Sequence, residues 1–422
     1  MRSQLHFDKE EPILQILIIS QYFWPETFRI NDLAQGLNQH GHQVTILTGQ
    51  PNYPEGHFFP GYGWFKKSRE DYCGMKVLRI PMLPRGKGGL RLMLNYLSFA
   101  LSACLLAPFR CTGKYDVIFV YEPSPITVGL PALLLKKLRR IPVAFWVQDL
   151  WPESLSATGA IRVPWILKLV ERMVREIYRG CDLILVQSRA FIPSVEKLGG
   201  VRERVFYFPN SAEALYKPVV LPQESDLRAA LPRGFRMMFA GNIGAAQDFE
   251  VILAAAEKLK SHTDIHWLIL GDGRMLPWVK GQIEARGLHN VVHLLGQHPV
   301  ESMPDYFSMA DAMLVTLKQQ PVFALTIPSK IQSYLACGKP IVAALDGEGA
   351  RIIDESRAGL AVQAEDSNAL ASAVLEMYRM TDAERQAMGK RGLQYFKENF
   401  EREMLLERLN GWLGKLEEKV RQ

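Results

Sequence analysis

Residues Thr326 to Ala343 (TIPSKIQSYLACGKPIVA) constrain the fold most, because they predict a helix followed directly by a buried strand. Ser329 is the predicted N-cap, Gly338 ends the helix, and Pro340 begins the apolar strand. Apolar side chains recur at the i, i+3, i+4 spacing of a core-facing stripe: Ile331, Tyr334 and Leu335. A helix joined in this way to a buried strand is typical of an α/β sheet.

Lys330 falls in the first turn of this predicted helix. Exposed backbone N–H groups and the helix macrodipole favour an anion there, and a lysine adds positive charge to a position suited to a phosphate. The alternative interpretation is a solvated surface lysine with no ligand.

Two other strands of the second half also run into glycine turns. Met237–Gly244 (MMFAGNIG) ends in a Gly-X-X-Gly turn, and Trp267–Gly273 (WLILGDG) ends in Gly-Asp-Gly. Glycine at a strand end lets backbone amides approach a ligand closely, because there is no Cβ atom in the way. Together with the Lys330 helix, these strand ends predict a nucleotide crevice at the carboxyl edge of a parallel sheet.

The order of these and other motifs resembles that of family 4 glycosyltransferases with the GT-B fold. The first half carries ILIISQYFWPETFRINDLAQGL, GHQVTILTG and VQDLWPESLSATG; FPNS follows, and the second half carries FAGNIG, LGDG, HLLGQ and SKIQSYLACGKPIVA. The resemblance covers nearly all of the chain. It is greatest to the fucosyl and N-acetylfucosaminyl transferases that build bacterial O-antigen, capsule or colanic acid.

The resemblance implies an α/β fold of the GT-B type, with two Rossmann-like domains facing each other across a cleft. A chain of 422 residues is too long for one ordinary core, and strand and helix patterns alternate in both halves. We expect an acceptor-binding domain over 1–208 and a nucleotide-sugar-binding domain over 209–395. A helix over 396–422 should cross back to the N-terminal domain, which the resemblance alone implies. The strands predicted in the first half are Ile13–Ser20, Gln43–Thr48, Val77–Ile80, Val117–Tyr121, Val143–Val147 and Leu183–Gln187.

The predicted donor site departs from the family pattern in its charges. An Arg and a Lys that usually meet the donor diphosphate fall on Asn242 and Gln247, so two positive charges are missing. Lys330 is the candidate replacement. A pair of glutamates usual in the family falls on Leu325 and Ser333. The predicted donor-binding residues are Gly241, Asn242, Gly244, Gln247, Gly271, Gly273, Ser329, Lys330, Ser333 and Glu348.

Glu348, in GEGA, is the candidate substitute that would bind the ribose hydroxyls; the alternative is a glutamate on a surface turn. The donor is a nucleotide sugar, with a UDP-sugar favoured over a GDP-sugar. No cofactor and no metal are expected, because no DxD-like acidic pair follows a strand of the second half.

Asp149 is the principal catalytic candidate of the first half. It follows the apolar strand VAFWV, where it would orient the acceptor or stabilise positive charge developing at the anomeric carbon. An N-cap role for its carboxylate is the alternative. Glu26 and Arg29 lie where a family loop approaches the transferred sugar, and a local ion pair is their alternative. The predicted catalytic residues are Asp149, Glu26, Arg29 and Glu153, and the acceptor-side candidates are Glu122, Asn52 and Asn95.

Charge is concentrated in the first half. Residues 1–210 hold 26 Lys and Arg against 17 Asp and Glu, whereas the rest of the chain is slightly acidic. No basic–aromatic interleaving indicates nucleic acid, so none is expected as a partner. The five cysteines lack metal-ligand spacing, and residues 1–12 lack the apolar core of a secretory signal.

An apolar run in the same half, Leu92–Ala107 (LMLNYLSFALSACLLA), is flanked by Arg91, Arg110 and Lys114. Sixteen residues are short for a membrane span of about twenty. A buried core helix, an interfacial helix and a transmembrane helix all remain open here. The basic flanks indicate a membrane surface as a partner, and we expect a cytoplasmic protein that is peripheral on the inner face of the membrane.

The expected function is a retaining, metal-independent glycosyltransferase in surface polysaccharide biosynthesis, of the hexosyltransferase class. It would move a sugar, with N-acetyl-L-fucosamine or L-fucose as candidates, from the nucleotide sugar to a polyprenyl-diphosphate-linked glycan. The alternatives are a non-catalytic scaffold or glycan-binding partner with the same fold, and a sugar-nucleotide epimerase. A dinucleotide-dependent oxidoreductase is disfavoured, because SQYFWPE stands where G-x-G-x-x-G would be needed.

Overall fold

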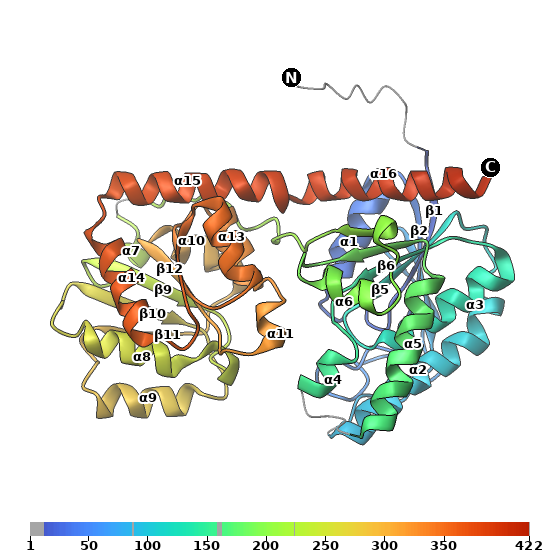
Figure 1. The fold of residues 1–422 in the computed structure, drawn as a ribbon, viewed down its shortest axis with the longest axis horizontal. Coiled ribbons are helices and arrows are strands. Elements are labelled where there is room, and N and C mark those ends of the chain that lie inside the picture. The colour runs from blue at the N-terminus through green and yellow to red at the C-terminus, as the bar shows by residue number, and fades with distance from the viewer. Residues whose placement is uncertain (1–11, 87, 158–162, 223, 422) are drawn as a thin grey trace. The chain divides into compact units, whose positions relative to one another are not determined.

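The protein is described from a computed structural model, which covers residues 12–86, 88–157, 163–222 and 224–421. The chain divides into two compact units (Figure 1). Unit 1 comprises Met1–Phe208 and Leu405–Gln422, and unit 2 comprises Pro209–Met404. Each unit is built on its own sheet, with helices packed around it, so each is described by itself.

Unit 1 contains an eight-stranded sheet in the order β3-β4-β2-β1-β5-β6-β7-β8. All neighbouring strands are parallel except β3 and β4. The strands are β1 (Gln15–Ile19), β2 (Gln43–Gly49), β3 (Arg69–Tyr72), β4 (Met75–Ile80), β5 (Val117–Glu122), β6 (Val143–Val147), β7 (Leu183–Val186) and β8 (Val205–Tyr207). The helices are α1 (Arg29–Gln39), α2 (Gly89–Arg110), α3 (Gly129–Arg139), α4 (Glu153–Ala157), α5 (Pro164–Gly180), α6 (Phe191–Lys197) and most of α16 (Arg402–Arg421), with short 3-10 helices η1 (Ile126–Val128) and η2 (Arg202–Arg204).

Unit 2 contains a six-stranded, wholly parallel sheet in the order β11-β10-β9-β12-β13-β14. Its strands are β9 (Phe235–Ala240), β10 (Ile265–Leu270), β11 (Val292–Gly296), β12 (Ala312–Thr316), β13 (Ile341–Ala344) and β14 (Gly359–Val362). Its helices are α7 (Asp226–Ala230), α8 (Phe249–Lys258), α9 (Leu276–Ala285), α10 (Met303–Ser308), α11 (Pro321–Ala324), α12 (Ser329–Ala336), α13 (Glu348–Ser356), α14 (Ser367–Arg379) and α15 (Asp382–Asn399), with 3-10 helices η3 (Ala245–Gln247) and η4 (Val300–Ser302).

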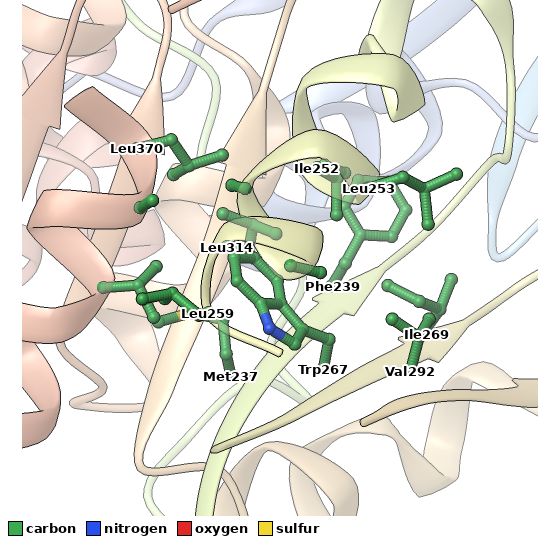
Figure 2. Close-up of a cluster of buried hydrophobic side chains, with 14 of the residues drawn as sticks. Met237, Phe239, Ile252, Leu253, Leu259, Trp267, Ile269, Val292, Leu314 and Leu370 are labelled. Carbon is green, nitrogen blue, oxygen red and sulfur yellow. The ribbon is translucent and has the colours of Figure 1, made fainter. Parts of the chain in front are cut away.

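The strands are apolar along their length because helices cover both faces of each sheet. Every residue of β5, β6, β10, β12 and β13 is buried. In unit 2 the core gathers around Trp267 of β10 and Phe239 of β9, which pack with Ile252 and Leu253 of α8 and with Leu370 of α14 (Figure 2). This dry core fixes the strand ends that carry the candidate site.

Three details differ from the sequence-based expectation. The edge strand β3 was not predicted, since REDY is polar and pairs only on one side. Ser329 is the first residue of α12 rather than its N-cap; Pro328 occupies the cap position, and no side chain caps the helix. The helix predicted over 396–422 is interrupted among the described residues, because α15 ends at Asn399 and α16 begins at Arg402.

The predicted apolar run lies in α2, which is longer than the run itself. Only one narrow face is buried, consisting of Asn95, Phe99, Ala100, Ala103 and Ala107. Large apolar side chains point outward instead, and they are Leu90, Met93, Leu94, Leu97, Leu101, Leu105 and Phe109, all at least 36% exposed. The helix is long and apolar enough to cross a membrane by length and composition alone. It is therefore not the core helix that one interpretation of the sequence expected.

Candidate functional site

The glycine turns of unit 2 lie where the strand order of its sheet reverses. Moving outward from β9, one half of the sheet continues through β10 and the other through β12. Ligands of open α/β sheets bind outside the carboxyl ends of the strands at such a switch point. Gly241 follows β9 and Gly271 follows β10, with φ of +136° and +132° respectively, a region that favours glycine. The sequence thus places its conformationally freest residues at the edge where a ligand would bind.

Lys330 reaches this edge from the first turn of α12. Its ammonium nitrogen lies 3.6 Å from the centre of the Phe239 ring, and a Cβ atom at Gly241 would lie 2.7 Å from Lys330 Cε. The aromatic face holds the cation without neutralising it. Among the residues that the structure describes, no carboxylate forms an ion pair with Lys330.

Tyr334, one helical turn after Lys330, anchors the same face of α12 to the end of β9. Its hydroxyl accepts a hydrogen bond from the Ala240 backbone N–H at 3.2 Å and lies 3.3 Å from the Ala240 carbonyl oxygen. Because residues i and i+4 share a helix face, this anchor directs Lys330 toward the Gly241 turn. Burial lowers the pKa of Lys330 to about 7. The site therefore holds an amine that an anion would recharge.

The two residues that replace the usual cations lie close to this turn. A Cβ atom at Gly244 would lie 2.6 Å from Asn242 Nδ2 and 2.9 Å from Gln247 Oε1, so both amides flank that glycine. The buried Gln247 Oε1 has no hydrogen-bond partner among the described residues. Gly273 packs against the same loop, because its Cβ would lie 2.3 Å from the Ile243 carbonyl oxygen. The turn is thus lined by neutral amides, and Lys330 supplies the charge.

Three other residues predicted to bind the donor lie on α12 and α13. Ser329 is exposed at the start of α12, and the buried Ser333 hydroxyl donates to the Ser329 carbonyl oxygen at 3.2 Å. Glu348 begins α13, is buried, and pairs with Arg351 at 2.7 Å. Its two carboxylate oxygens are both occupied by that guanidinium, so a ribose would have to share them.

In unit 1, two buried carboxyl groups meet at the ends of β5 and β6. Glu122, fully buried, ends β5, and the Asp149 backbone N–H lies 3.5 Å from its Oε2 atom. Burial raises the pKa of Asp149 to about 6, opposed by a hydrogen bond from Ser124, and raises the pKa of Glu122 further, with the Asp149 charge adding to the effect. Burial thus disfavours the charged form of both carboxyl groups.

Aromatic side chains surround Asp149 and were not anticipated from the sequence. Tyr96 of α2 lies close enough to Asp149 for that charge to raise its pKa, whereas Arg85 lowers it. Trp151 donates its indole N–H to Ser124 Oγ at 3.0 Å and packs edge-on against Tyr96. Ser124 carried one available signal, since it stands two residues after Glu122 in YEPSP.

Glu26 and Asn52 form a buried bridge between the loops that follow β1 and β2. Glu26 Oε1 accepts the backbone N–H groups of Asn52 at 2.7 Å and Tyr53 at 2.8 Å, and Oε2 accepts that of Phe23 at 3.3 Å. Burial nevertheless raises the pKa of Glu26 to about 7. Asn52 in turn accepts the Arg85 backbone N–H at 2.7 Å. In this geometry Glu26 holds backbone rather than presenting a free carboxylate.

The remaining candidates of unit 1 are spread over three helices. Arg29 begins α1, and its charge opposes the burial that raises the pKa of Tyr121. Glu153 begins α4, and its buried Oε2 has no hydrogen-bond partner in the described chain. Asn95 lies in the buried face of α2, where its Oδ1 accepts from Gln21 at 2.8 Å and its Nδ2 donates to the Leu83 carbonyl oxygen. Both of its amide groups are therefore engaged within the unit.

No cluster of three or more His, Cys, Asp or Glu able to hold a metal ion occurs among the described residues. The five cysteines are all unpaired thiols.

Comparison with known families matches both halves of the chain. Residues 27–211 match the family model described as "Glycosyl transferase 4-like domain", and residues 234–380 match "Glycosyl transferases group 1". The colanic acid biosynthesis glycosyl transferase WcaI of Escherichia coli K12 is 25% identical over 77% of this chain and 82% of its own length. The glycosyltransferase WbjE of Pseudomonas aeruginosa is 31% identical over 58% of this chain and 64% of its own.

Among solved structures, HepE of Anabaena, in complex with UDP and glucose, superposes with a TM-score of 0.67 at 16% identity, covering 95% of this chain and all of that one. At this identity the likeness concerns the fold. With a parallel α/β sheet in each unit and a glycosyl transferase family model matching each half, the chain belongs to the glycosyltransferases of GT-B fold, combining a 4-like N-terminal domain with a group 1 C-terminal domain.

Proposed function

We propose that this protein is a retaining, metal-independent transferase that moves a sugar from a nucleotide sugar to a polyprenyl-diphosphate-linked glycan. A UDP-sugar is the favoured donor, a GDP-sugar is the second candidate, and N-acetyl-L-fucosamine or L-fucose is the candidate sugar. The product would enter a surface polysaccharide such as O-antigen or capsule.

The observation that carries the proposal is the position of Lys330. Its ammonium lies over Phe239 beside the Gly241 turn, and no described carboxylate neutralises it. A departing nucleoside diphosphate gains negative charge as the bond to the sugar breaks. A preorganised cation with no competing anion is the kind of group that stabilises such charge.

The names of two relatives support a role in polysaccharide biosynthesis. The E. coli relative is named for colanic acid biosynthesis, and a Bacillus subtilis relative, 27% identical over 47% of this chain, is named for teichuronic acid biosynthesis. Both names denote cell-surface polysaccharides. The HepE structure of the same fold holds UDP, which supports a uridine nucleotide as the first donor to test.

Asp149 is the proposed catalytic carboxylate of unit 1. Its pKa of about 6 leaves it ionised at neutral pH, so it can accept a hydrogen bond from an acceptor hydroxyl or stabilise positive charge at the anomeric carbon. Ser124 fixes the carboxylate through a side-chain hydrogen bond. The resemblance to family 4 supports retention of anomeric configuration.

The exposed apolar face of α2 supports attachment to the cytoplasmic face of the membrane. Leu101, Leu105 and Phe109 are 65%, 62% and 77% exposed on a single helix. Exposed apolar patches of this kind mark interaction surfaces, and basic flanks favour anionic lipid. A peripheral enzyme at that surface would meet both a soluble donor and a lipid-borne acceptor.

The test is a transfer assay with the purified full chain, radiolabelled UDP- and GDP-sugars, and a synthetic polyprenyl-diphosphate-linked saccharide. Transfer of label to the lipid fraction is expected, with Lys330→Ala slowed on the order of 10²–10³-fold. Lys280→Ala, which removes an exposed lysine from α9, is the matched control and should behave as wild type.

Two other results would identify the alternatives. Formation of an epimerised free nucleotide sugar would make the protein an epimerase. Nucleotide or glycan binding without turnover, with every donor and acceptor tried, would make it a non-catalytic partner.

A further inference from the structure

The apolar surface of unit 1 contains a cavity that the proposed membrane contact does not explain. It has a volume of about 270 Å³, and its exposed lining is almost entirely apolar. The cavity lies between α2, which supplies Leu92, Met93 and Leu97, and α5, which supplies Ile166, Val170 and Met173. A surface that only touched a bilayer would need no hollow. This one could enclose part of a hydrocarbon chain.

One end of this cavity borders the Asp149 site. Tyr96 and Trp151 both line it. Tyr96 lies within reach of the Asp149 charge, and Trp151 is hydrogen-bonded to Ser124, the side chain that binds the Asp149 carboxylate. The apolar lining is therefore continuous with the polar residues at the ends of β5 and β6.

Arg85 supplies positive charge at the same end. Its charge acts on the hydroxyl groups of both Tyr96 and Tyr22, and its guanidinium lies 5.1 Å from the centre of the Tyr53 ring. In the part of the chain that is described, no carboxylate forms an ion pair with it. Aromatic faces hold an arginine in place while leaving its hydrogen-bond donors available to a phosphate.

We propose that the α2–α5 cavity binds the isoprenoid chain of the acceptor lipid next to its diphosphate, and that Arg85 binds the diphosphate itself. An apolar groove with an unpaired arginine at one end is complementary to a ligand with a hydrocarbon chain and an anionic head. A volume near 270 Å³ accommodates only a short length of chain, so the rest would stay in the bilayer. Trp165 and Leu169 of α5, exposed at 67% and 61%, add to the apolar surface of the same helix.

The proposal rests on the lipid-linked acceptor of the proposed function, but binding can be tested without transfer. The probe is farnesyl diphosphate, kept below its aggregation concentration and titrated into the full chain by calorimetry. Saturating UDP is present throughout, so that the diphosphate cannot occupy the Lys330 site. Inorganic diphosphate and farnesol serve as the head-only and tail-only ligands.

Farnesyl diphosphate should bind at least about tenfold more tightly than either fragment, since each buried methylene contributes roughly fourfold in affinity. Val170→Trp fills the cavity and should weaken binding about tenfold or more, while Arg85→Gln should weaken it about tenfold through loss of the charged contact. Leu138→Ser, at an exposed position of α3 outside the cavity lining, is the matched control and should leave binding unchanged.

Equal affinities for farnesyl diphosphate and inorganic diphosphate would overturn the proposal, as would wild-type binding by Val170→Trp. If Val170→Trp instead changed the oligomeric state and no isoprenoid bound, the cavity would be an interface between copies of the chain. Sugar transfer to the polyprenyl-diphosphate-linked saccharide, by a protein that binds farnesyl diphosphate no more tightly than inorganic diphosphate, would reject this site and leave the proposed function standing. Isoprenoid binding without any sugar transfer would support this site and reject the proposed function.

Discussion

A Cβ atom at Gly271 would lie 1.9 Å from the carbonyl oxygen of Gly241, so the turns after β10 and β9 touch through their backbones. Gly241 in turn is the residue over which the Lys330 side chain passes. The shape of the Gly241 turn therefore depends on Gly271, which follows the neighbouring strand.

Gly271→Ala should destabilise unit 2 and weaken nucleotide binding together. The added methyl group meets backbone rather than a flexible side chain, and φ at this position is +132°, so the loop must shift. We expect a lower melting temperature and at least a tenfold loss of UDP affinity, measured by calorimetry. Gly281→Ala, at an open position inside α9, is the control and should not weaken binding. Unchanged UDP affinity in a folded Gly271→Ala protein would show that the shape of the Gly241 turn does not depend on Gly271.

Nucleotide binding should take up a proton above pH 7. With a pKa of about 7 in the free protein, Lys330 is roughly 90% neutral at pH 8, and a bound diphosphate would recharge it. UDP affinity should then fall by up to about tenfold per pH unit from pH 8 upward, where the nucleotide itself is fully ionised. Calorimetry in buffers of different ionisation enthalpy measures the uptake directly. Lys330→Met should abolish it, and persistent uptake in that variant would assign the proton elsewhere.

Transfer activity should have an acid limb near pH 6 that belongs to Asp149. Its kcat/KM is expected to fall about tenfold per pH unit below that value, and Asp149→Asn should lose on the order of 10²–10⁴ in rate. Glu122→Gln is the matched control, because burial and the Asp149 charge favour the protonated form of Glu122, which an amide mimics; its rate should stay within a few-fold of wild type. A limb that moved or vanished in Glu122→Gln would contradict this assignment.

The same Asp149 substitution should stabilise the fold. The folded-state pKa of about 6 exceeds the ordinary value, so unfolding releases a proton between about pH 4 and 6, and stability contributed by the protonated group is lost as pH rises through 6. At pH 8, Asp149→Asn should therefore raise stability by on the order of 1–3 kcal/mol, measured by denaturant unfolding. A destabilised variant would show that the ionised carboxylate is held by contacts that outweigh its burial.

Activity should survive chelation. The two acidic residues that follow β13 are engaged within the unit, Asp346 by the Ala364 backbone N–H and Glu348 by Arg351. We therefore expect Lys330 to supply the charge that a divalent ion supplies elsewhere. Turnover in EDTA should match turnover in added Mg²⁺ or Mn²⁺. Complete loss in EDTA with recovery on adding either metal would refute it.

Vesicle binding should depend on the exposed face of α2 and not on its buried face. Leu94→Glu with Leu101→Glu alters side chains that are 44% and 65% exposed, so the protein should stay folded but no longer sediment with anionic vesicles at low salt. Phe99→Glu, on the fully buried face of the same helix, should instead unfold unit 1. If the protein stayed bound to the vesicles at high salt and only detergent released it, α2 would be a membrane-spanning helix.

Strands and glycine turns could be predicted from the sequence because their signals are local. Val143–Val147 was predicted with its observed bounds. Five other strands of the first half were predicted with bounds close to the observed ones. Gly241 and Lys330 could be singled out for the same reason, since each carries its own local signal.

Contacts across the sheet could not be predicted in this way. Nothing near Phe239 in the sequence indicates that Lys330, 91 residues later, lies over its ring, and nothing near Arg85 indicates Tyr53. The sequence also did not indicate which side chains of α2 are exposed, because an apolar run has the same composition whether its leucines contact a core or solvent. Glu26 is a further example: a glutamate after a strand suggests chemistry, and nothing in the local sequence indicates that its partners are three backbone amides.

The discontinuity of unit 1 has a consequence for the order in which the protein is made. Leu405, Leu406, Leu409 and Leu413 are all buried, and Asn410 is hydrogen-bonded to His42 at 3.1 Å, yet a ribosome translates these residues only after the whole of unit 2. At about 5–20 residues per second, the first 208 residues would wait roughly 10–40 seconds for the segment that completes their core. Unit 2, being continuous, can finish folding first even though its synthesis starts second. The nascent chain would thus expose an unfinished apolar surface for nearly half of its synthesis, which is the condition under which chaperones bind.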